Sequence, residues 1–256
     1  LGGTGGLRVG AGLLKLADPD AGLVVSDPSW ENHQALFSRA GFAVGTYRYY
    51  AAATRSVDVD GMIADLSAAA PGTVVVLHAR CHNPTGNELS PADWDRVIAA
   101  VADNGLVPFL DMAYQGFAKS LEEDSSVVRA FADAGLTFFC STSFSKSFSL
   151  YGERVGALSV VCADADEAKR VLSQMKIVVR TNYSNPPTHG AALVVAVLRD
   201  PELRAQWVAE LGQMRDRIKQ MREALVAGLR AEGIDDMGFI TDQVGMFSYS
   251  GLTKEQ

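Results

Sequence analysis

Short apolar runs rich in β-branched residues alternate along the chain with segments whose apolar positions recur every three or four residues. The runs predict buried strands, and the recurring positions predict helices. We expect strands at residues 23–25, 42–48, 73–77, 106–110, 137–140 and 156–161. We expect helices up to about residue 17 and at residues 32–40, 60–70 (capped by Asp60), 91–103, 123–134 and 165–178. This alternation is typical of an α/β fold with a mostly parallel central sheet and flanking helices.

The last third of the chain has a different pattern. Asp200 followed by Pro201 is typical of a helix cap and first turn. Apolar residues then recur at spacings of three and four: Leu203, Trp207, Leu211, Met214, Ile218, Met221, Leu225 and Leu229. They predict one long helix at about residues 201–231, which would join a large domain (1–213) to the start of a smaller one (214–256). A long surface helix has the same spacing, so the pattern alone leaves both interpretations open.

Both ends of the sequence resemble interior segments of a protein. The chain opens on a glycine-rich loop, Gly2-Gly3-Thr4-Gly5-Gly6, with no strand before it. It closes on residues 251–256, which we interpret as the beginning of a helix. We therefore expect the sequence to be an internal piece of a longer protein.

Composition excludes several classes of protein. Of 256 residues, 48% are hydrophobic and 21% are charged, which is the balance of a folded globular chain and not of a disordered one. The formal net charge of −7 gives no basic footprint for nucleic acid. No uncharged apolar run reaches the length of a membrane span, and no signal peptide is evident.

Cysteine and histidine positions indicate neither disulfides nor a metal site. Cys81, Cys140 and Cys162 include no CxxC pair, which favours a reduced, cytoplasmic setting. The four histidines have no metal-binding spacing, and we interpret them as packing groups or as groups that orient other side chains: His33, His78, His82 and His189.

Lys146 is the first candidate for chemistry. It follows an apolar strand within Ser143-Phe144-Ser145-Lys146-Ser147, where hydroxyl groups could hold a phosphate. A lysine whose pKa is lowered by burial or by nearby cations can form a Schiff base. Most lysines are solvated surface groups, and Ser143-x-x-Lys146 also fits the S-x-x-K motif of serine acyl transferases. The companion S-D-N and K-T-G motifs of those enzymes are missing from the sequence.

Asp111 and Tyr114 lie at the end of another predicted strand. A carboxylate there can face a bound ligand, because α/β sheets bind ligands at the carboxyl ends of their strands. Considered alone, Asp111 is equally compatible with capping a turn, and Tyr114 with packing in the core. Together with Lys146 they match the needs of pyridoxal phosphate chemistry, which uses a lysine and a carboxylate against the pyridine nitrogen.

Several further groups could complete such a site. Arg154, together with Gly3 and Thr4 before the first helix, could hold a phosphate. The glycines do not form a dinucleotide fingerprint, since Arg8 stands where the third glycine would fall. Three other side chains are candidates with ordinary structural alternatives: Trp30 for stacking on a ring, Asn83 for a ring oxygen or substrate carboxylate, and Arg180 for a substrate carboxylate.

Taken in order, these segments resemble the class I pyridoxal phosphate aminotransferases, in particular the bacterial aromatic (tyrosine) and aspartate aminotransferases. The resemblance runs along essentially the whole chain. Its anchors are Gly2-Gly3-Thr4-Gly5, Ser26-Asp27-Pro28-Ser29-Trp30, Cys81-His82-Asn83-Pro84-Thr85-Gly86, Asp111-Met112-Ala113-Tyr114-Gln115-Gly116-Phe117, Ser143-Phe144-Ser145-Lys146, Tyr151-Gly152-Glu153-Arg154-Val155-Gly156 and Asn182-Tyr183-Ser184-Asn185-Pro186-Pro187.

The resemblance implies a fold, a cofactor and a set of roles. The fold is the aspartate aminotransferase type (pyridoxal phosphate fold type I), with part of a smaller α+β domain, and the cofactor is pyridoxal 5′-phosphate. Lys146 would be the Schiff-base lysine and proton shuttle, and Asp111 the partner of the pyridine nitrogen. The remaining roles would be a ring-oxygen pair (Tyr114, Asn83), a stacking residue (Trp30), a phosphate cup (Gly3, Thr4, Ser143, Arg154) and a clamp for a distal substrate carboxylate (Arg180).

The implied reaction is ping-pong transamination through an aldimine, with 2-oxoglutarate as amino acceptor. The segment around Lys146 and the run Gly156-Ala157-Leu158-Ser159-Val160 look closer to aromatic than to aspartate enzymes. We therefore expect phenylalanine, tyrosine and also aspartate as substrates, in a homodimer with shared sites. Alternatives are a strict aspartate aminotransferase or a truncated, non-catalytic homologue that binds a partner. The family's upstream tyrosine and C-terminal substrate arginine have no counterpart in this sequence.

Overall fold

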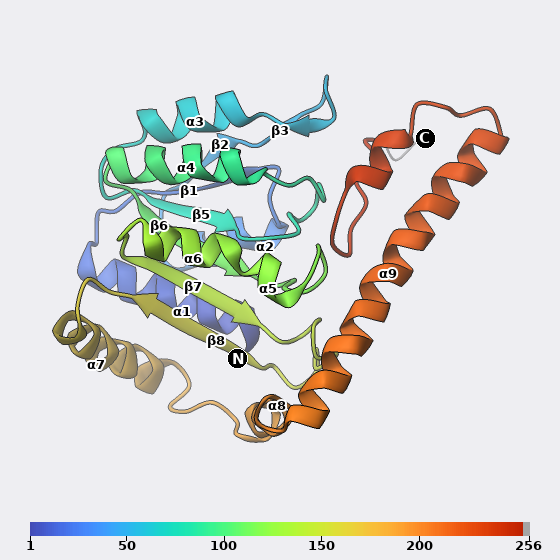
Figure 1. Cartoon of the computed structure of the whole chain (residues 1–256). Coiled ribbons are helices and arrows are strands. Elements are labelled where there is room, and N and C mark those ends of the chain that lie inside the picture. Colours follow the sequence, from blue (N-terminus) through green and yellow to red (C-terminus); the bar gives the residue numbers. More distant parts are fainter. Residues whose placement is uncertain (253–256) are drawn as a thin grey trace.

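A six-stranded sheet forms the centre of the molecule (Figure 1), whose computed structural model describes residues 1–252. The strand order is β2-β1-β5-β6-β7-β8. The first five strands are mutually parallel, and β8 runs antiparallel to β7. Their bounds are β1 Leu23–Asp27, β2 Val44–Arg48, β5 Val74–His78, β6 Val107–Met112, β7 Phe138–Ser143 and β8 Gly156–Val161. The mostly parallel α/β sheet expected from the sequence is confirmed.

Helices cover both faces of this sheet. Side chains of α1, α2 and α7 pack in the buried cluster on one face, and side chains of α3, α4 and α6 pack in the cluster on the other. The bounds are α1 Gly2–Ala17, α2 Glu31–Arg39, α3 Val59–Ala68, α4 Pro91–Asp103, α6 Ser126–Asp133 and α7 Ala165–Asn182. The sheet is thus buried on both sides, which explains why all five residues of β5 are buried.

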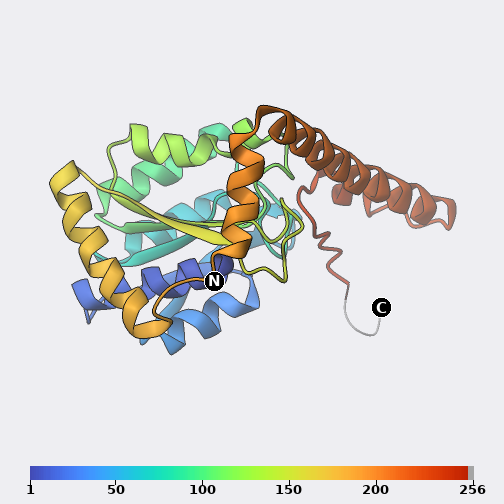
Figure 2. The ribbon, with the colours of Figure 1, turned by 90° about the horizontal axis from the view of Figure 1, so that it is seen from below.

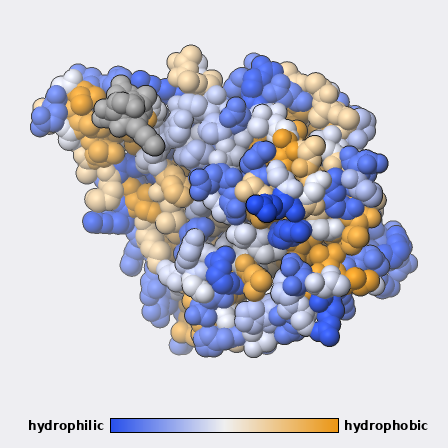
Figure 3. Space-filling model, turned by 180° about the vertical axis from the view of Figure 1, so that it is seen from behind, coloured by the Kyte–Doolittle hydropathy of each residue, from blue (hydrophilic) through white to orange (hydrophobic). Residues whose placement is uncertain are grey.

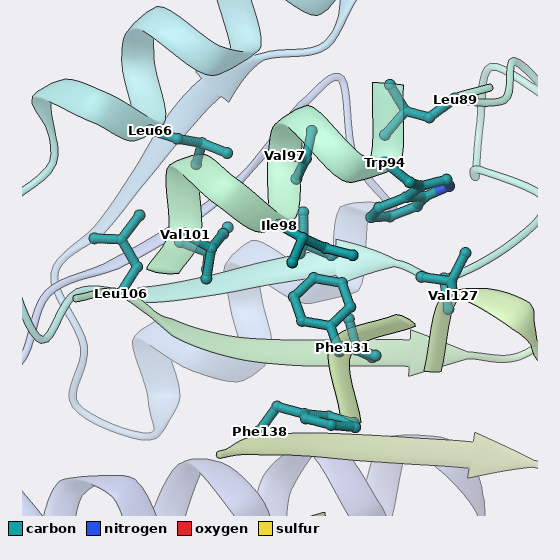
Figure 4. Packing of buried hydrophobic residues seen from close by; sticks show 14 of the residues in the cluster. Leu66, Leu89, Trp94, Val97, Ile98, Val101, Leu106, Val127, Phe131 and Phe138 are labelled. Carbon is teal, nitrogen blue, oxygen red and sulfur yellow. The ribbon is translucent and has the colours of Figure 1, made fainter. Parts of the chain in front are cut away.

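The larger cluster shows how the apolar pattern becomes a core (Figure 4). Val97 and Val101 lie one turn apart on α4 and are fully buried against the sheet. Trp94 meets Phe131 of α6 edge to face, with ring centroids 6.2 Å apart. Phe131 in turn packs on Phe138 of β7. The apolar side chains that recur every three to four residues in α4 therefore lie on one face of the helix, as in any amphipathic helix.

The start of α4 agrees with the local sequence, whereas the cap of α3 differs from the expected one. Ser90 and Asp93 form a capping box in front of Pro91, so α4 begins where the sequence predicts. The expected cap of α3 at Asp60 is wrong. Asp58 caps this helix, because its side chain accepts a hydrogen bond from the amide of Gly61.

Two other expectations are corrected. The glycine-rich opening is the first turn of α1 and not a loop before it. The single helix expected at 123–134 is two, α5 (Leu121–Asp124) and α6. The break falls where the buried Asp124 carboxylate accepts hydrogen bonds from amides of the preceding loop, those of Gly116, Ala118 and Lys119.

The sequence patterns did not reveal four short or isolated elements. They are the hairpin of β3 (Tyr50–Ala51) and β4 (Ser56–Val57), helix α8 (His189–Arg199) and the 3₁₀ helix η1 (Gly238–Asp242). The segment 251–256, expected to start a helix, lies mostly outside the described residues, and residues 251 and 252 are not helical.

The long helix is confirmed as α9, Pro201–Ala231, with Asp200 as its cap. Leu211 and Trp207 in its first half pack near Phe117 of the main body. Val226 in its second half belongs to a separate small cluster with η1. The helix projects away from the sheet (Figure 2). The domain division at residue 213 stays a prediction, with which the two clusters are compatible. None of the described helices is both long and apolar enough to cross a membrane.

Candidate active site

An open pocket of about 490 Å³ lies at the carboxyl end of the parallel strands. It is lined by Gly3, Thr4, Leu7, Trp30, His78, Asn83, Asp111, Ala113, Tyr114, Ser143, Ser145, Lys146, Tyr151 and Arg154. Nine of the ten residues singled out from the sequence are in this set, and Arg180 is the exception. Parallel strands bring their carboxyl ends to one edge, which is why His78, Asp111 and Ser143 of three different strands converge here.

Asp111 lies within β6, where it is 5% exposed. Nε2 of His33 donates a hydrogen bond to its Oδ2 at 2.8 Å. Burial alone would raise the pKa of Asp111. The hydrogen bond from His33, with smaller contributions from nearby positive charge, outweighs this and holds the pKa of Asp111 below its usual value. Asp111 is therefore an anion at the base of the pocket, suited to a protonated ring nitrogen.

His33 continues this arrangement behind the carboxylate. It is fully buried on α2, and its Nδ1 lies 3.0 Å from the hydroxyl of Ser29. Its ring meets Trp30 edge to face at 5.2 Å. The sequence analysis allowed an orienting role for the histidines but did not indicate Asp111 as the partner of His33, although the i,i+3 spacing of Trp30 and His33 would place both on one side of a helix start.

His78, at the end of β5, is the second group that the sequence did not single out. Both of its ring nitrogens are buried without a hydrogen-bond partner among the described residues, although the ring borders the pocket. Burial and the nearby His82 keep the pKa of His78 well below its usual value, so the ring is neutral. His33, His78 and Asp111 bring ligand atoms within 4.8 Å of one another. In this structure His33 and Asp111 are hydrogen-bonded directly to each other.

Lys146 projects into the pocket from the turn after β7. Its Nζ makes no hydrogen bond or ion pair within residues 1–252, and lies 5.0 Å from the centre of the Tyr114 ring and 5.5 Å from that of Tyr151. Burial lowers the pKa of Lys146, and the Arg154 charge adds to this against the opposing effect of Asp111. A half-buried amine without a polar partner is available to react.

Tyr114 and Asn83 form one side of the pocket. The Asn83 amide lies at 3.5 Å from the Tyr114 hydroxyl and donates to it. Burial first, and then the charge of Asp111, raise the pKa of Tyr114, so its phenol stays protonated and can donate a hydrogen bond.

The opposite end is built for an anion. The first turn of α1 presents amides that lack partners within the helix, beside the hydroxyl of Thr4. Arg154 supplies a cation and donates to Oγ of Ser145 at 3.3 Å. A Cβ at Gly3 would lie 2.9 Å from Cβ of Ser143, so this close approach requires glycine. Ser145, one of the hydroxyl groups expected near a phosphate, lines the pocket, as does Tyr151, which was not predicted as a site residue.

Arg180 lies elsewhere. It is exposed in the last turn of α7, where it donates a hydrogen bond to Ser184. It does not border the pocket of its own chain. A role for Arg180 in substrate binding would therefore require a second chain to present it.

These features fit a planar heterocycle that carries a phosphate. An anionic carboxylate matches a protonated ring nitrogen, and a phenol matches a ring oxygen. The helix start matches a phosphate, and the free amine of Lys146 matches an aldehyde carbon. The unpartnered nitrogens of His78 show that the pocket wall still has hydrogen-bonding capacity to satisfy.

Comparison with known proteins agrees with this geometry. The family model of aminotransferase class I and II matches residues 1–256. The chain is 59% identical to the aspartate aminotransferase of Pseudomonas aeruginosa and 51% identical to the aromatic-amino-acid aminotransferase of Escherichia coli. Each alignment covers 100% of this chain and 65% of the relative, so the chain spans about two thirds of the length of these relatives.

Solved structures give the same answer. The fold superposes with a TM-score of 0.98 on an aromatic-amino-acid aminotransferase from Burkholderia pseudomallei covalently bound to pyridoxal phosphate, at 62% sequence identity. The match covers 99% of this chain and 64% of that one. A second aromatic amino acid aminotransferase, from Burkholderia cenocepacia, gives a TM-score of 0.96 at 50% identity, with 100% and 64% coverage. The aspartate aminotransferase type of fold expected from the sequence is thereby confirmed.

Proposed function

This chain belongs to the class I and II aminotransferases, and on that premise we propose that it binds pyridoxal 5′-phosphate and transaminates aromatic amino acids and aspartate. The observation that carries the proposal is the convergence of Lys146, Asp111 and the start of α1 on one pocket. The residue roles given below are part of the same proposal.

Each residue in the pocket has a place around the cofactor. Lys146 would hold its aldehyde carbon, and Asp111, oriented by His33, would pair with its ring nitrogen. Tyr114 would donate to its ring oxygen, with Asn83 beside it. The phosphate would lie on the first turn of α1, in contact with these side chains and amides: Gly3, Thr4, Ser143 and Arg154. Trp30 would stack against the ring.

The chemistry divides between the cofactor and the chain. When bound, the cofactor supplies an electron-withdrawing ring that accepts the electron pair left when a substrate α-carbon loses its proton. Once the amino group of the substrate has replaced it at the aldehyde carbon, the free Nζ of Lys146 would take up that proton and return it to the acceptor carbon, and its lowered pKa favours this role. Asp111 remains ionised during this transfer and keeps the ring nitrogen protonated.

Substrate choice rests on both groups of relatives. The aromatic enzymes among the solved structures support aromatic donors such as phenylalanine and tyrosine. The choice of 2-oxoglutarate as acceptor rests on the family resemblance of the sequence. A strict aspartate aminotransferase is the second candidate, favoured by the 59% identity to the Pseudomonas aeruginosa enzyme.

Two features of the chain support a homodimer. Arg180 lies outside the pocket, and α8 next to it in sequence exposes Leu193, Val195 and Leu198. Exposed apolar surface of this kind is typical of an interface, and a second copy could bring its Arg180 to the pocket.

A reduced, cytoplasmic setting is supported by three free thiols: Cys81, Cys140 and Cys162.

A substrate panel tests the proposal. Phenylalanine, tyrosine, aspartate and alanine are each offered with 2-oxoglutarate and pyridoxal phosphate, and glutamate formation is measured. We expect kcat/KM for phenylalanine and aspartate to exceed that for alanine by roughly 100-fold or more, as two extra favourable contacts would give. Turnover with aspartate alone would favour the second candidate. Tight cofactor binding with no glutamate from any donor would favour a non-catalytic homologue.

A serine acyl transferase is poorly supported. Oγ of Ser143 accepts a hydrogen bond from the Ser145 amide and packs against Gly3 at the anion end of the pocket. Such a hydroxyl is placed to contact a phosphate and not to attack a carbonyl. A mechanism-based β-lactam that acylated Ser143 would reverse this assignment.

A further inference from the structure

Arg222 is a buried cation with an unusual set of partners. It lies in the second half of α9 and is only 7% exposed. No carboxylate forms an ion pair with it among the described residues, and burial lowers its pKa. Its guanidinium donates instead to the carbonyls of Gly245 and Phe247, both at 2.6 Å, and to the hydroxyl of Ser248 at 2.9 Å. A buried charge with neutral partners only is costly and calls for a reason.

The carbonyls that it holds belong to a compact loop, residues 243–249, which we call the wall loop. Gln243 closes this loop, because its side chain accepts from the amide of Tyr249 and donates to the Tyr249 carbonyl. The amide of Val244 donates to the carbonyl of Gly86 at 2.8 Å. Gly245 has φ +83°, and a Cβ there would lie 2.5 Å from Cβ of Cys81. The wall loop is therefore docked tightly on the 81–86 segment that carries Asn83.

The wall loop also reaches the candidate active site. Phe247 meets the Tyr114 ring edge to face, with centroids 5.9 Å apart and planes at 88°. The same tyrosine receives a hydrogen bond from Asn83, and its ring lies 5.0 Å from Nζ of Lys146. Phe247 therefore links the two sites directly: Arg222 binds its backbone carbonyl, and its ring contacts the ring of Tyr114 in the pocket.

We propose that Arg222 is a positioning residue for the active site: it fixes the wall loop so that Phe247 holds Tyr114 in place beside Lys146. It acts through the backbone of Gly245 and Phe247 and contacts no ligand itself. Its planar fork of donors suits two carbonyls and a hydroxyl at once, which a lysine cannot reproduce. These contacts also connect α9 to the pocket, because Arg222 lies on α9 and Tyr114 follows β6. The effect on the cofactor rests on the function proposed above, whereas the effect on the wall loop does not.

Amide hydrogen exchange tests the first link without cofactor. We compare the full chain with Arg222→Met, Arg222→Lys and the matched control Arg217→Met, which removes an exposed arginine of the same helix. Exchange in the peptide that covers the wall loop should rise by roughly 10- to 100-fold in Arg222→Met, the factor expected for lost hydrogen bonds to a charge. Arg222→Lys should fall between, and the β6 peptide and the control should not change. Unchanged exchange in Arg222→Met would overturn the proposal. If that variant does not fold, Ser248→Ala removes one partner only and should give a smaller rise, whereas no rise would again overturn it.

A double-mutant cycle tests the second link. Affinity for pyridoxal phosphate is followed by tryptophan fluorescence, since Trp30 borders the pocket. Phe247→Leu should weaken binding by roughly 2- to 10-fold, the range of an aromatic pair. The same substitution should have almost no further effect in the Arg222→Met background. Additive effects would show that Arg222 does not act through Phe247, even where Lys146 still binds the cofactor. A chain that binds no cofactor fails the proposed function and leaves the exchange result to decide the role of Arg222.

Discussion

Two regions of the molecule differ in how far their apolar side chains are buried. The first is the central sheet with helices α1–α6, and the second is helices α7–α9. In the first region the central strands β5, β6 and β7 are buried almost throughout, and residues such as Phe37, Phe109 and Phe131 are completely buried. In the second region α7 has no buried residue over 18 positions. Apolar side chains remain largely exposed along α9, among them Leu203, Val208, Met214, Met221 and Leu225.

Apolar side chains are also exposed at the surface. On the face seen in Figure 3, apolar residues gather in several patches between hydrophilic ones. Exposed large apolar side chains occur on consecutive helices, such as Leu172 on α7 and Leu198 on α8, and contiguous surface of this kind is typical of interfaces. The comparison teaches that the pocket-bearing region satisfies its own apolar surface, whereas α7–α9 present surface suited to a partner.

The largest expected effect lies in the first region. Lys146→Ala removes the one amine that both binds the cofactor and moves the proton. The kcat for transamination should therefore fall by at least ~10⁴-fold. Lys176→Ala, an exposed lysine of α7, is the matched control and should keep normal turnover. Initial-rate measurements with phenylalanine check both variants. Near-normal turnover in Lys146→Ala would contradict the assignment of the pocket.

Stability should separate the two regions next. Phe131→Ala empties a fully buried site between α4 and β7, and should lower the free energy of unfolding by about 3–5 kcal/mol. Leu172→Ala, at a position 50% exposed on α7, should change it by less than about 0.5 kcal/mol. Urea unfolding at low protein concentration, where a dimer would dissociate, measures both. Equal losses would mean that α7 is as well packed as the sheet.

Arg180 connects the second region to the pocket only through a partner chain. Arg180→Leu should reduce kcat/KM for aspartate and 2-oxoglutarate by roughly 10- to 100-fold, the contribution of a charge-assisted hydrogen bond to a carboxylate. The loss for phenylalanine should be much smaller, because it has no distal carboxylate. Single-turnover kinetics with each amino acid check this separately from the acceptor. A uniform loss on all substrates would remove the clamp role.

The smallest expected effect is a pH dependence of the free energy of unfolding, caused by a histidine in the buried region. Burial lowers the pKa of His82 to about 3, so the folded chain binds fewer protons than the unfolded chain below about pH 6.5. Stability is therefore full above that pH and is lost as pH falls, by about 1.4 kcal/mol per pH unit for this residue. Chemical denaturation at pH 7 and pH 5 should show a shallower dependence in His82→Gln. His189→Gln, which replaces an exposed histidine, should keep the original slope.

The sequence predicted the fold well where local chemistry is decisive. The α4 bounds follow from Ser90 and Pro91, and β8 appears where its apolar run predicts. The errors have tertiary causes. The 123–134 helix breaks because Asp124 is turned to a neighbouring loop, and the cap of α3 is decided by which of two nearby aspartates reaches the Gly61 amide.

The site was predictable in its reactive groups but not in their supports. Lys146, Asp111 and Tyr114 stand in recognisable segments, and the structure brings them together. The contact of His33 with Asp111 spans 78 positions, and that of Arg222 with the wall loop depends on how α9 leaves the sheet. Such pairings are set by topology, and no spacing in the sequence records them. Arg180 shows the remaining gap, since its proposed site would need a second chain.

Borohydride reduction of the chain incubated with pyridoxal phosphate, followed by peptide mass mapping, tests the central claim most directly. The account predicts one phosphopyridoxyl adduct, on Lys146, because this amine is half-buried, unpartnered within the described residues and close to the anion-binding start of α1. Lys176 and the other exposed lysines serve as internal controls and should remain unmodified at stoichiometric cofactor. Adducts spread over surface lysines with none enriched at Lys146 would contradict it.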